Sequence, residues 1–266
     1  MRRNLMESTT VKNGFATAIT SQSLTDLITN KISAIRIENF MMETERDIAL
    51  RNIRYHTQNT TYLWASDFSV IGTSVGEAHE SEEKERSYFA QAADTNRLLQ
   101  NSVFPFGSPM SRVGKMVLDA WAPGLKIAHR DDQTFLPEIV RHWRTGGGAH
   151  PHIDQTVTPL LSHLGLQKRL GCNVYMDMPS EGGSIEFWNR QFSDEEYEAA
   201  KRADYGLDRD ILGKPSLTIR PNAPEMVLFD ASQPHAVEPA RGHGDRIVNA
   251  AFFAFGGYDK PLVQFA

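Results

Sequence analysis

The first part of the chain, up to about residue 125, carries its apolar residues mainly at helical spacing. Four ranges show this period of three to four residues and are predicted to be helices: 23–30, 43–54, 82–100 and 111–121. Alternation in AIRIENF (34–40) predicts one strand among them. Residues 55–80 follow neither period, and we expect them to be irregular.

From about residue 134 the pattern changes to short strands separated by turns. Seven ranges are predicted to be strands: 135–144, 151–156, 169–178, 184–187, 216–220, 226–229 and 246–255. Turn-rich segments punctuate them: PSEGG (179–183), RPNAPE (220–225) and ARGHGD (240–245). One helix interrupts the series, because Ser193 and Glu196 form a capping box and Gly206 closes the segment.

Helices followed by a series of short strands predict an α+β, mainly β protein, with helices packed outside a β-sandwich or barrel. The sequence shows no internal repeat and no linker rich in Pro, Gly or Ser. We therefore expect one domain over residues 1–266. In it, residues 1–125 form a mostly helical N-terminal part, and residues 134–258 form the β core with a helical insertion at 190–213.

Composition limits the class of partner. The formal net charge is -5 and the basic residues are scattered, so nucleic acid is not expected to bind. A single cysteine, Cys172, excludes an internal disulfide and a zinc cluster built on cysteines, and its apolar surroundings predict a buried thiol. The sequence offers no secretory signal and no stretch long enough for a membrane span, so we expect a cytoplasmic protein without a membrane partner. The oligomeric state is left open.

Three His-x-Asp pairs are the candidate metal ligands of the chain. Two histidines and one carboxylate form the facial triad of non-haem Fe(II) oxygenases. In a strand, residues i and i+2 point to the same side, so His-x-Asp can place two ligands together. The three pairs are His129/Asp131, His152/Asp154 and His243/Asp245.

The context of each pair decides among them. The last pair lies in a turn flanked by glycines, and no later histidine can complete a triad. The first pair lies in a polar connection, AHRDDQ. The middle pair, His152/Asp154, opens a predicted strand directly after three glycines, and His235 offers a distant third ligand.

His235 precedes Arg246 by eleven residues, with turn residues between them. A hairpin centred near residues 240–241 would make His235 and Arg246 approximate cross-strand neighbours. A co-substrate such as 2-oxoglutarate would chelate the metal with its keto acid end, and its far carboxylate would need the planar fork of an arginine. Arg246 begins the apolar run RIVNAAFFAF, where a buried cation is costly without an anion. Alternatively, its side chain reaches solvent at the strand end.

With these residues in place, the chain resembles the Fe(II)/2-oxoglutarate-dependent dioxygenases. Within them, QTFLPEIVRHWRTGGGAHPHID (133–154) and HAVEPARGHGDRIVNAAFFAF (235–255) are similar to the carrier-independent alkaloid halogenases of the welwitindolinone type. The segment RSYFAQAADTNRLLQNSVFPFGSP (86–109) is similar to them more loosely. The resemblance implies a double-stranded β-helix core, which is a jelly roll like that of the cupins.

The resemblance also implies roles for single residues. His152, Asp154 and His235 would hold Fe(II), and Arg246 would bind the distal carboxylate of 2-oxoglutarate. The reaction would consume O2 and 2-oxoglutarate and release succinate and CO2. The halogenases have glycine where this chain has Asp154, which leaves them a coordination site for chloride. The aspartate therefore implies hydroxylation of a small molecule, such as an amino acid, an amino-acid derivative or a natural-product intermediate.

Further residues are expected around this centre. Asn173 and Tyr175 alternate along one predicted strand and could contact 2-oxoglutarate, while Phe252 shares a strand face with Arg246 and could wall the same pocket. Each of the three could instead be ordinary packing.

Three more residues are candidate substrate contacts. His150 would share a face with His152, or could be an exposed residue. Trp188 could shape the pocket, or could be a core tryptophan. Arg141 could meet a substrate carboxylate, or could be a solvated residue at a strand end.

Other outcomes stay open at this point. The same cofactors could support desaturation, ring formation or halogenation. A jelly roll that binds a divalent metal without redox chemistry, or an isomerase, is a different class with the same three ligands. An oxygenase acting on a protein side chain is a further alternative.

Overall fold

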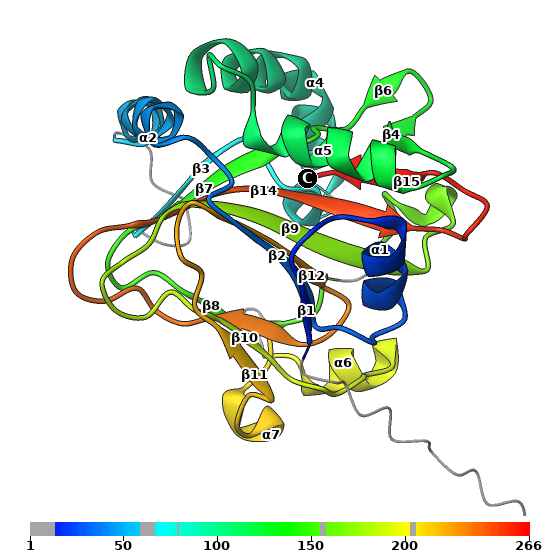
Figure 1. The fold of residues 1–266 in the computed structure, drawn as a ribbon. Coiled ribbons are helices and arrows are strands. Elements are labelled where there is room, and N and C mark those ends of the chain that lie inside the picture. The colour runs from blue at the N-terminus through cyan, green and yellow to red at the C-terminus, as the bar shows by residue number, and fades with distance from the viewer. Residues whose placement is uncertain (1–13, 59–66, 79, 155–157, 203–205) are drawn as a thin grey trace, which may run out of the picture.

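The computed structural model of the chain describes residues 14–58, 67–78, 80–154, 158–202 and 206–266 (Figure 1). Its helices are α1 (Ser21–Ile28), α2 (Glu43–Thr57), α3 (Val75–Ala78), α4 (Glu82–Leu98), α5 (Pro109–Ala120), α6 (Asp194–Ala200) and α7 (Arg209–Leu212). A π-helical turn, Leu99–Val103, extends α4, and a 3-10 turn spans Ser162–Leu164. The four helices predicted in the N-terminal part are confirmed, with ends shifted by a few residues.

Helix starts follow from local capping. The hydroxyl of Ser81 accepts a hydrogen bond from the Lys84 backbone N–H at the start of α4. Ser108 caps α5 in the same way, and Pro109 takes the first helical position, where its missing N–H costs nothing. The capping box of Ser193 and Glu196 predicted from the sequence begins α6 as expected.

Most strands of the described residues belong to one large, mainly antiparallel sheet. Along the sheet they run in the order β1 (Phe15–Ala16), β2 (Ala34–Glu38), β12 (Glu225–Asp230), β9 (Lys168–Asp177), β14 (Arg246–Phe255), β15 (Leu262–Phe265) and β4 (Leu125–Ile127). Two more strands, β7 (Ile139–Trp143) and β3 (Phe68–Ile71), extend it beside the first half of β14. We call this the major sheet.

A second, smaller sheet faces the major one. It contains, in order, β11 (Leu217–Ile219), β10 (Ile185–Phe187), β13 (His235–Val237) and β8 (Ala149–His152), and we call it the minor sheet. The ring of Phe187 on β10 contacts that of Phe229 on β12, with centroids 5.3 Å apart, so side chains fill the space between the sheets. A separate hairpin, β5 (His129–Arg130) with β6 (Gln133–Thr134), lies outside both.

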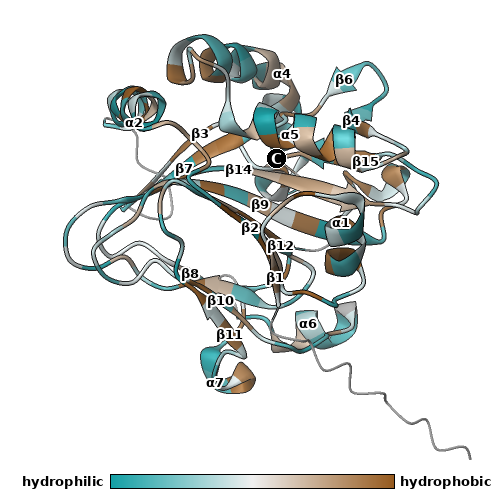
Figure 2. Ribbon diagram, in the orientation of Figure 1, coloured by the Kyte–Doolittle hydropathy of each residue, from teal (hydrophilic) through white to brown (hydrophobic). Residues whose placement is uncertain are grey.

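Strand alternation gives the major sheet two different faces. Its outer face carries Cys172, Val174 and Phe253, which pack in one hydrophobic cluster with residues of α1, α2 and α5. Its inner face carries Tyr175 and Phe252 and shares a second cluster with β10 and β11 of the minor sheet. Figure 2 shows hydrophobic residues concentrated along these strands and hydrophilic ones on the loops and outward helix turns. The thiol of Cys172 is buried, as predicted.

The bounds of several predicted elements differ from the structure. The range 55–80 was expected to be irregular, but α2 continues to Thr57, and β3 and α3 follow later in the range. β3 pairs with β7. Residues 59–66 and 79 lie outside the described part. The major sheet also takes in β2, β3, β4 and β15, which lie outside 134–258. The predicted strand 151–156 is centred earlier, on β8, and its last two residues lie outside the described part.

The hairpin expected between His235 and Arg246 is wrong. β13 pairs with β8 and β10 in the minor sheet, whereas β14 pairs with β7, β9 and β15 in the major sheet. The turn residues 241–245 therefore carry the chain from one sheet to the other. Among the helices that the structure describes, none has the length and apolar character needed to cross a membrane.

Candidate metal centre

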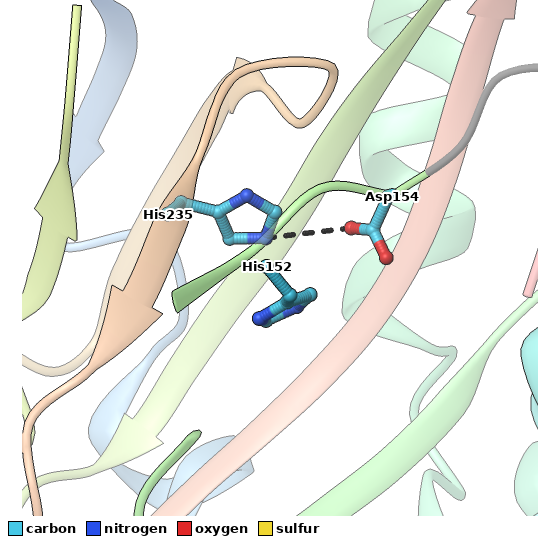
Figure 3. A group of neighbouring side chains, drawn as sticks. All are labelled: His152, Asp154 and His235. Carbon is cyan, nitrogen blue, oxygen red and sulfur yellow. Dashed lines mark ion pairs between the residues drawn. The ribbon is translucent and has the colours of Figure 1, made fainter. Parts of the chain in front are cut away.

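Two paired strands of the minor sheet bring His152, Asp154 and His235 together from two distant parts of the chain (Figure 3). His152 ends β8, Asp154 lies two residues beyond it, and His235 begins β13 directly opposite His152 in the strand register. One ligand atom from each residue lies within 4.8 Å of the other two. Nε2 of His235 and Oδ2 of Asp154 lie 3.4 Å apart.

Main-chain carbonyls set the orientation of both histidines. Nδ1 of His152 lies 2.8 Å from the carbonyl oxygen of His150, and Nδ1 of His235 lies 2.9 Å from that of Gln233. A carbonyl oxygen can only accept, so each Nδ1 carries the proton and donates it. Each Nε2 is left with a free lone pair, which is the tautomer a metal ligand requires, and Nε2 of His235 faces Asp154.

The electrostatics of the group favour the protonation states that bind a metal. Burial, together with the neighbouring His235, lowers the pKa of His152 to about 4, so its ring is neutral at pH 7. Burial opposes ionisation of Asp154, but its close contact with His235 and the charge of Arg169 outweigh it. The pKa of Asp154 therefore lies below its usual range, and its carboxylate is ionised.

These donors fit a divalent iron. Two neutral imidazoles and one carboxylate are the facial donor set of non-haem Fe(II) enzymes, and they cover one face of an octahedron. Metal–ligand bonds of about 2.1 Å at right angles place such donors about 3 Å apart. The observed separation of 3.4 Å between His235 and Asp154 is close to that value.

An aromatic pair backs the centre from inside the protein. The ring of Phe229 lies edge-on to His235, with centroids 5.3 Å apart, and also contacts Phe187, the cross-strand partner of His235. Phe229 also covers Gly171, its partner across β9 and β12. A Cβ added at Gly171 would approach a ring carbon of Phe229 to 2.8 Å, so glycine leaves the room that this ring occupies.

Arg246 is buried on the inner face of the major sheet, with 2% of its surface exposed. Its Nε donates to the carbonyl of Gly183, and its Nη2 donates to the hydroxyl of Tyr175, at 3.1 and 3.3 Å. Asn173 donates to the same hydroxyl from Nδ2, at 3.3 Å. The structure therefore brings Arg246, Tyr175 and Asn173 together on one face, although the expected strand pairing of Arg246 with His235 is wrong.

The prediction did not include Arg169, a second buried arginine of this face. It is 4% exposed, and its guanidinium lies 3.6 Å from the ring centroid of Phe252 and 5.1 Å from that of Phe265. Phe252 thus faces inward as predicted, against a cation. Arg169 shares the parity of Asn173 and Tyr175 along β9, so strand alternation alone would have placed it on the inner face.

The three candidate substrate residues lie in different environments in the structure. Trp188 is buried and donates from Nε1 to the carbonyl of Gly213, and Arg209 of α7 lies over its ring, so it packs against the helical insertion. Trp188 is therefore a core tryptophan, which was the alternative to a residue that shapes the pocket. His150 is exposed and serves the centre through its carbonyl oxygen. Arg141 lies in the middle of β7, half-buried, opposite Val248 of β14.

Neither of the other His-x-Asp pairs joins a metal-binding group among the described residues. His129 is exposed in the β5–β6 hairpin, and Asp131 forms its turn with a positive φ of 55°. Oδ2 of Asp245 lies 3.1 Å from Nε2 of His142, at the edge of α2.

Comparison with solved structures places the fold. The chain superposes on an N-substituted L-amino acid dioxygenase from Burkholderia ambifaria AMMD with a TM-score of 0.63 and 18% identity, over 92% of this chain and 91% of that chain. A complex of such a dioxygenase with alpha-KG (2-oxoglutarate), from the same organism, gives a TM-score of 0.61 and 17% identity over the same shares. A search of curated proteins found no match.

Fold and site together define a class: the protein is a non-haem iron oxygenase of the Fe(II)/2-oxoglutarate-dependent superfamily. Enzymes of this class use Fe(II) as cofactor and 2-oxoglutarate and O2 as co-substrates. Within the class, residues 16–262 match the model of the carrier-protein-independent halogenase WelO5, and the chain belongs to that family.

Proposed function

We propose that this protein hydroxylates a C–H bond of a small molecule, using Fe(II), 2-oxoglutarate and O2, and releases succinate and CO2. The observation that carries the proposal is the carboxylate of Asp154, 3.4 Å from Nε2 of His235, in a family of halogenases. A halogenase needs a coordination position for chloride, and the resemblance to the alkaloid halogenases implies glycine at this point of the chain. Here the carboxylate takes that position, which favours transfer of oxygen over transfer of halogen.

In this proposal the residues of the site have the following roles. His152, Asp154 and His235 hold the iron, which supplies the oxidising chemistry when 2-oxoglutarate and O2 are bound. Arg246 binds the distal carboxylate of 2-oxoglutarate through its planar fork. Tyr175 holds that fork in place from the neighbouring strand β9, and burial of the guanidinium keeps water from competing for it.

The proposal also concerns the architecture of the protein. We interpret the major and minor sheets as the two sides of a double-stranded β-helix, and residues 1–266 as one domain with its N-terminal helices outside the barrel. The opposed sheets, with the candidate ligands on β8 and β13, support this interpretation. The solved dioxygenase with this fold is described as acting on N-substituted L-amino acids, so these compounds are the first to test as substrates here.

The test is succinate release from 2-oxoglutarate with Fe(II) and O2, in the presence of a panel of N-substituted amino acids and small alkaloids. We expect His152→Ala to abolish this release, because the site loses one of its three donors. His129→Ala is the matched control, since His129 is exposed in the β5–β6 hairpin. Unchanged succinate release by His152→Ala would contradict the proposal.

Halogenation is the second candidate, because the family match favours it. Turnover in buffers that contain chloride or bromide, followed by mass spectrometry of the product, separates the two. We expect a product that carries oxygen and no halogen in either buffer. A halogenated product from the unmodified protein would overturn hydroxylation, and loss of two hydrogens or ring closure would reassign the outcome to desaturation or cyclisation.

A further inference from the structure

β8, the strand that carries His152, lies at an edge of the minor sheet. Among the strands that the structure describes, it pairs with β13 alone, and the pairing contains an irregularity. An edge strand leaves one row of N–H and C=O groups without a partner in the sheet. Asp154 lies beyond the strand end, where its backbone N–H donates to the carbonyl of Ala231 at 3.0 Å. The sheet therefore holds the end of β8 from one side.

The helical insertion (190–213, of which residues 203–205 lie outside the described part) contacts the other side of β8. The backbone N–H of Leu207 donates to the carbonyl of Pro151 at 2.6 Å. Proline has no N–H, so this carbonyl is the main-chain group that residue 151 can offer to a partner. Main-chain groups alternate in direction along a strand, and His152 pairs with β13, so this bond lies on the side of β8 away from β13.

Gly206 permits this close approach. Its φ is +70°, which favours glycine, and a Cβ would lie 2.5 Å from the carbonyl oxygen of Pro151 and 3.1 Å from the Cβ of His150. Helix α6 ends at Ala200, so Gly206 is not its C-terminal cap. The residue instead allows the insertion to touch the strand of the metal ligands.

Tyr197 of α6 makes a second contact with the same stretch of chain. It is buried, and its hydroxyl is in close contact with the main chain of Ile153, the residue between the ligands His152 and Asp154. Burial raises the pKa of Tyr197, and the nearby charge of Asp154 raises it too. The hydroxyl therefore keeps its proton and lies on the ligand side of the insertion.

The insertion is also fixed to the minor sheet at β10. Arg209 of α7 forms an ion pair with Glu186 of β10, at 2.5 Å between Nη2 and Oε2, and Trp188 donates from Nε1 to the carbonyl of Gly213. Glu186 lies on the outer face, because the residues on either side of it belong to the inner cluster. α7 accordingly lies beyond the minor sheet, away from the major one (Figure 1). The insertion thus ties β8 to β10, two strands away in the same sheet.

We propose that the helical insertion is a positioning element for the metal centre. Through Gly206, Leu207 and Tyr197 it holds the end of β8, so that the two ligands of this strand stay in register with the third, on β13. The inference rests on the proposed function, which assigns these ligands. It implies that substitutions outside the barrel weaken metal binding while the set of donor atoms stays the same.

The test measures metal binding by EPR of Mn(II), without 2-oxoglutarate or substrate, in the unmodified protein and in Gly206→Ala and Tyr197→Phe. The signal of the free ion gives the Kd, and the spectrum of bound Mn(II) at saturation reports the arrangement of its ligands. Thermal unfolding of the metal-free proteins measures their stability separately.

We expect Gly206→Ala to raise the Kd of Mn(II) about tenfold or more, because the methyl group separates the insertion from β8. Tyr197→Phe keeps the ring and removes only the hydroxyl, so we expect a rise of about threefold to tenfold. The spectrum of bound Mn(II) should change in both variants, which a loss of stability alone would not cause.

Two matched controls separate positioning from stability. Gly165→Ala introduces similar backbone strain, because Gly165 has a φ of +60°, but nothing lies within 4 Å of the added Cβ. Tyr88→Phe also removes a buried hydroxyl, which accepts the backbone N–H of Leu136 at 2.9 Å. Both controls should lower the Tm and leave the Kd and the spectrum of Mn(II) unchanged.

A Kd and a spectrum that stay at the unmodified values in Tyr197→Phe or in Gly206→Ala would overturn the inference, and so would equal changes in the two controls. His152→Ala separates this inference from the proposed function. If His152→Ala binds Mn(II) as tightly as the unmodified protein, the metal centre itself is wrongly assigned. If His152→Ala loses the metal while both insertion variants retain it, only the positioning role of the insertion is wrong.

Discussion

Replacing Gly171 by alanine should disturb the metal centre through a single aromatic ring. The added Cβ would lie 2.8 and 3.1 Å from two ring carbons of Phe229, closer than van der Waals contact allows. Phe229 has little room to withdraw, because its ring packs against both Phe187 and His235, cross-strand neighbours on the minor sheet, each at 5.3 Å between centroids. The ring can move only by displacing one of these neighbours.

The magnitude follows from overpacking of a buried site. An extra methyl group in a close-packed core costs about 1–3 kcal/mol. For a chain of this size, that corresponds to a fall in Tm of about 2–12 °C. Displacement of a ligand imidazole by its neighbours typically weakens metal binding by about 10–100-fold. We therefore expect Gly171→Ala to lower both the stability and the metal affinity, although residue 171 is not a ligand.

Thermal unfolding of the metal-free protein and titration with Mn(II) measure the two effects. Gly76→Ala on α3 is the matched control, because the nearest atom to its Cβ is Oγ of Ser74 at an ordinary 3.6 Å. Alanine in a helix is favoured over glycine by about 0.5–1 kcal/mol, so the control should be neutral or slightly more stable.

A second substitution tests the cause. Phe229→Leu shortens the side chain that the new methyl group strikes, so the double variant Gly171→Ala/Phe229→Leu should lose less stability than the sum of the two single variants. Additive losses would refute the reasoning. So would a Gly171→Ala protein that matches the unmodified one in both Tm and Mn(II) affinity.

Two further predictions concern the co-substrate and the protonation of the centre. Tyr175→Phe removes the oxygen that accepts a hydrogen bond from Arg246, so the KM for 2-oxoglutarate should rise about fivefold to tenfold. The control Tyr258→Phe, at an exposed tyrosine, should leave this KM unchanged. An unchanged KM in Tyr175→Phe would count against the assigned pocket. Burial lowers the pKa of His152 to about 4, so an NMR titration of the metal-free protein should show its ring neutral at pH 5. Because the lowered pKa favours folding above the ordinary pKa near 6.5, the stability should decline as the pH falls from 6.5 towards 4. A titration midpoint of His152 near 6.5 would contradict the argument.

Strand periodicity predicted much of the site. The two-residue repeat placed Asn173 and Tyr175 on one face of β9 and Arg246 and Phe252 on one face of β14, and both groups face inward. The same count places Asn249 on the opposite face, where its Nδ2 donates to Glu138 beneath α5. This success has a simple cause, since the direction of a side chain in a strand depends only on its parity.

Pairing between strands could not be predicted in the same way. The segment 238–245 has the composition of a hairpin turn, but a chain crossing between two sheets uses the same glycines and polar residues. Which sheet a strand joins depends on distant partners, such as Trp143 opposite Arg246. The strand Leu262–Phe265 was missed for a related reason: its four residues are too few for a period to show, and all are buried.

The carbonyl groups of residues 150 and 233, which hold the imidazoles of His152 and His235, belong to the main chain. Every amino acid supplies the same carbonyl, so the side chains at these two positions can be exchanged while the rings keep their direction. Natural divergence or directed evolution can thus vary residues next to the iron, and with them the choice of substrate, without first having to rebuild the metal site.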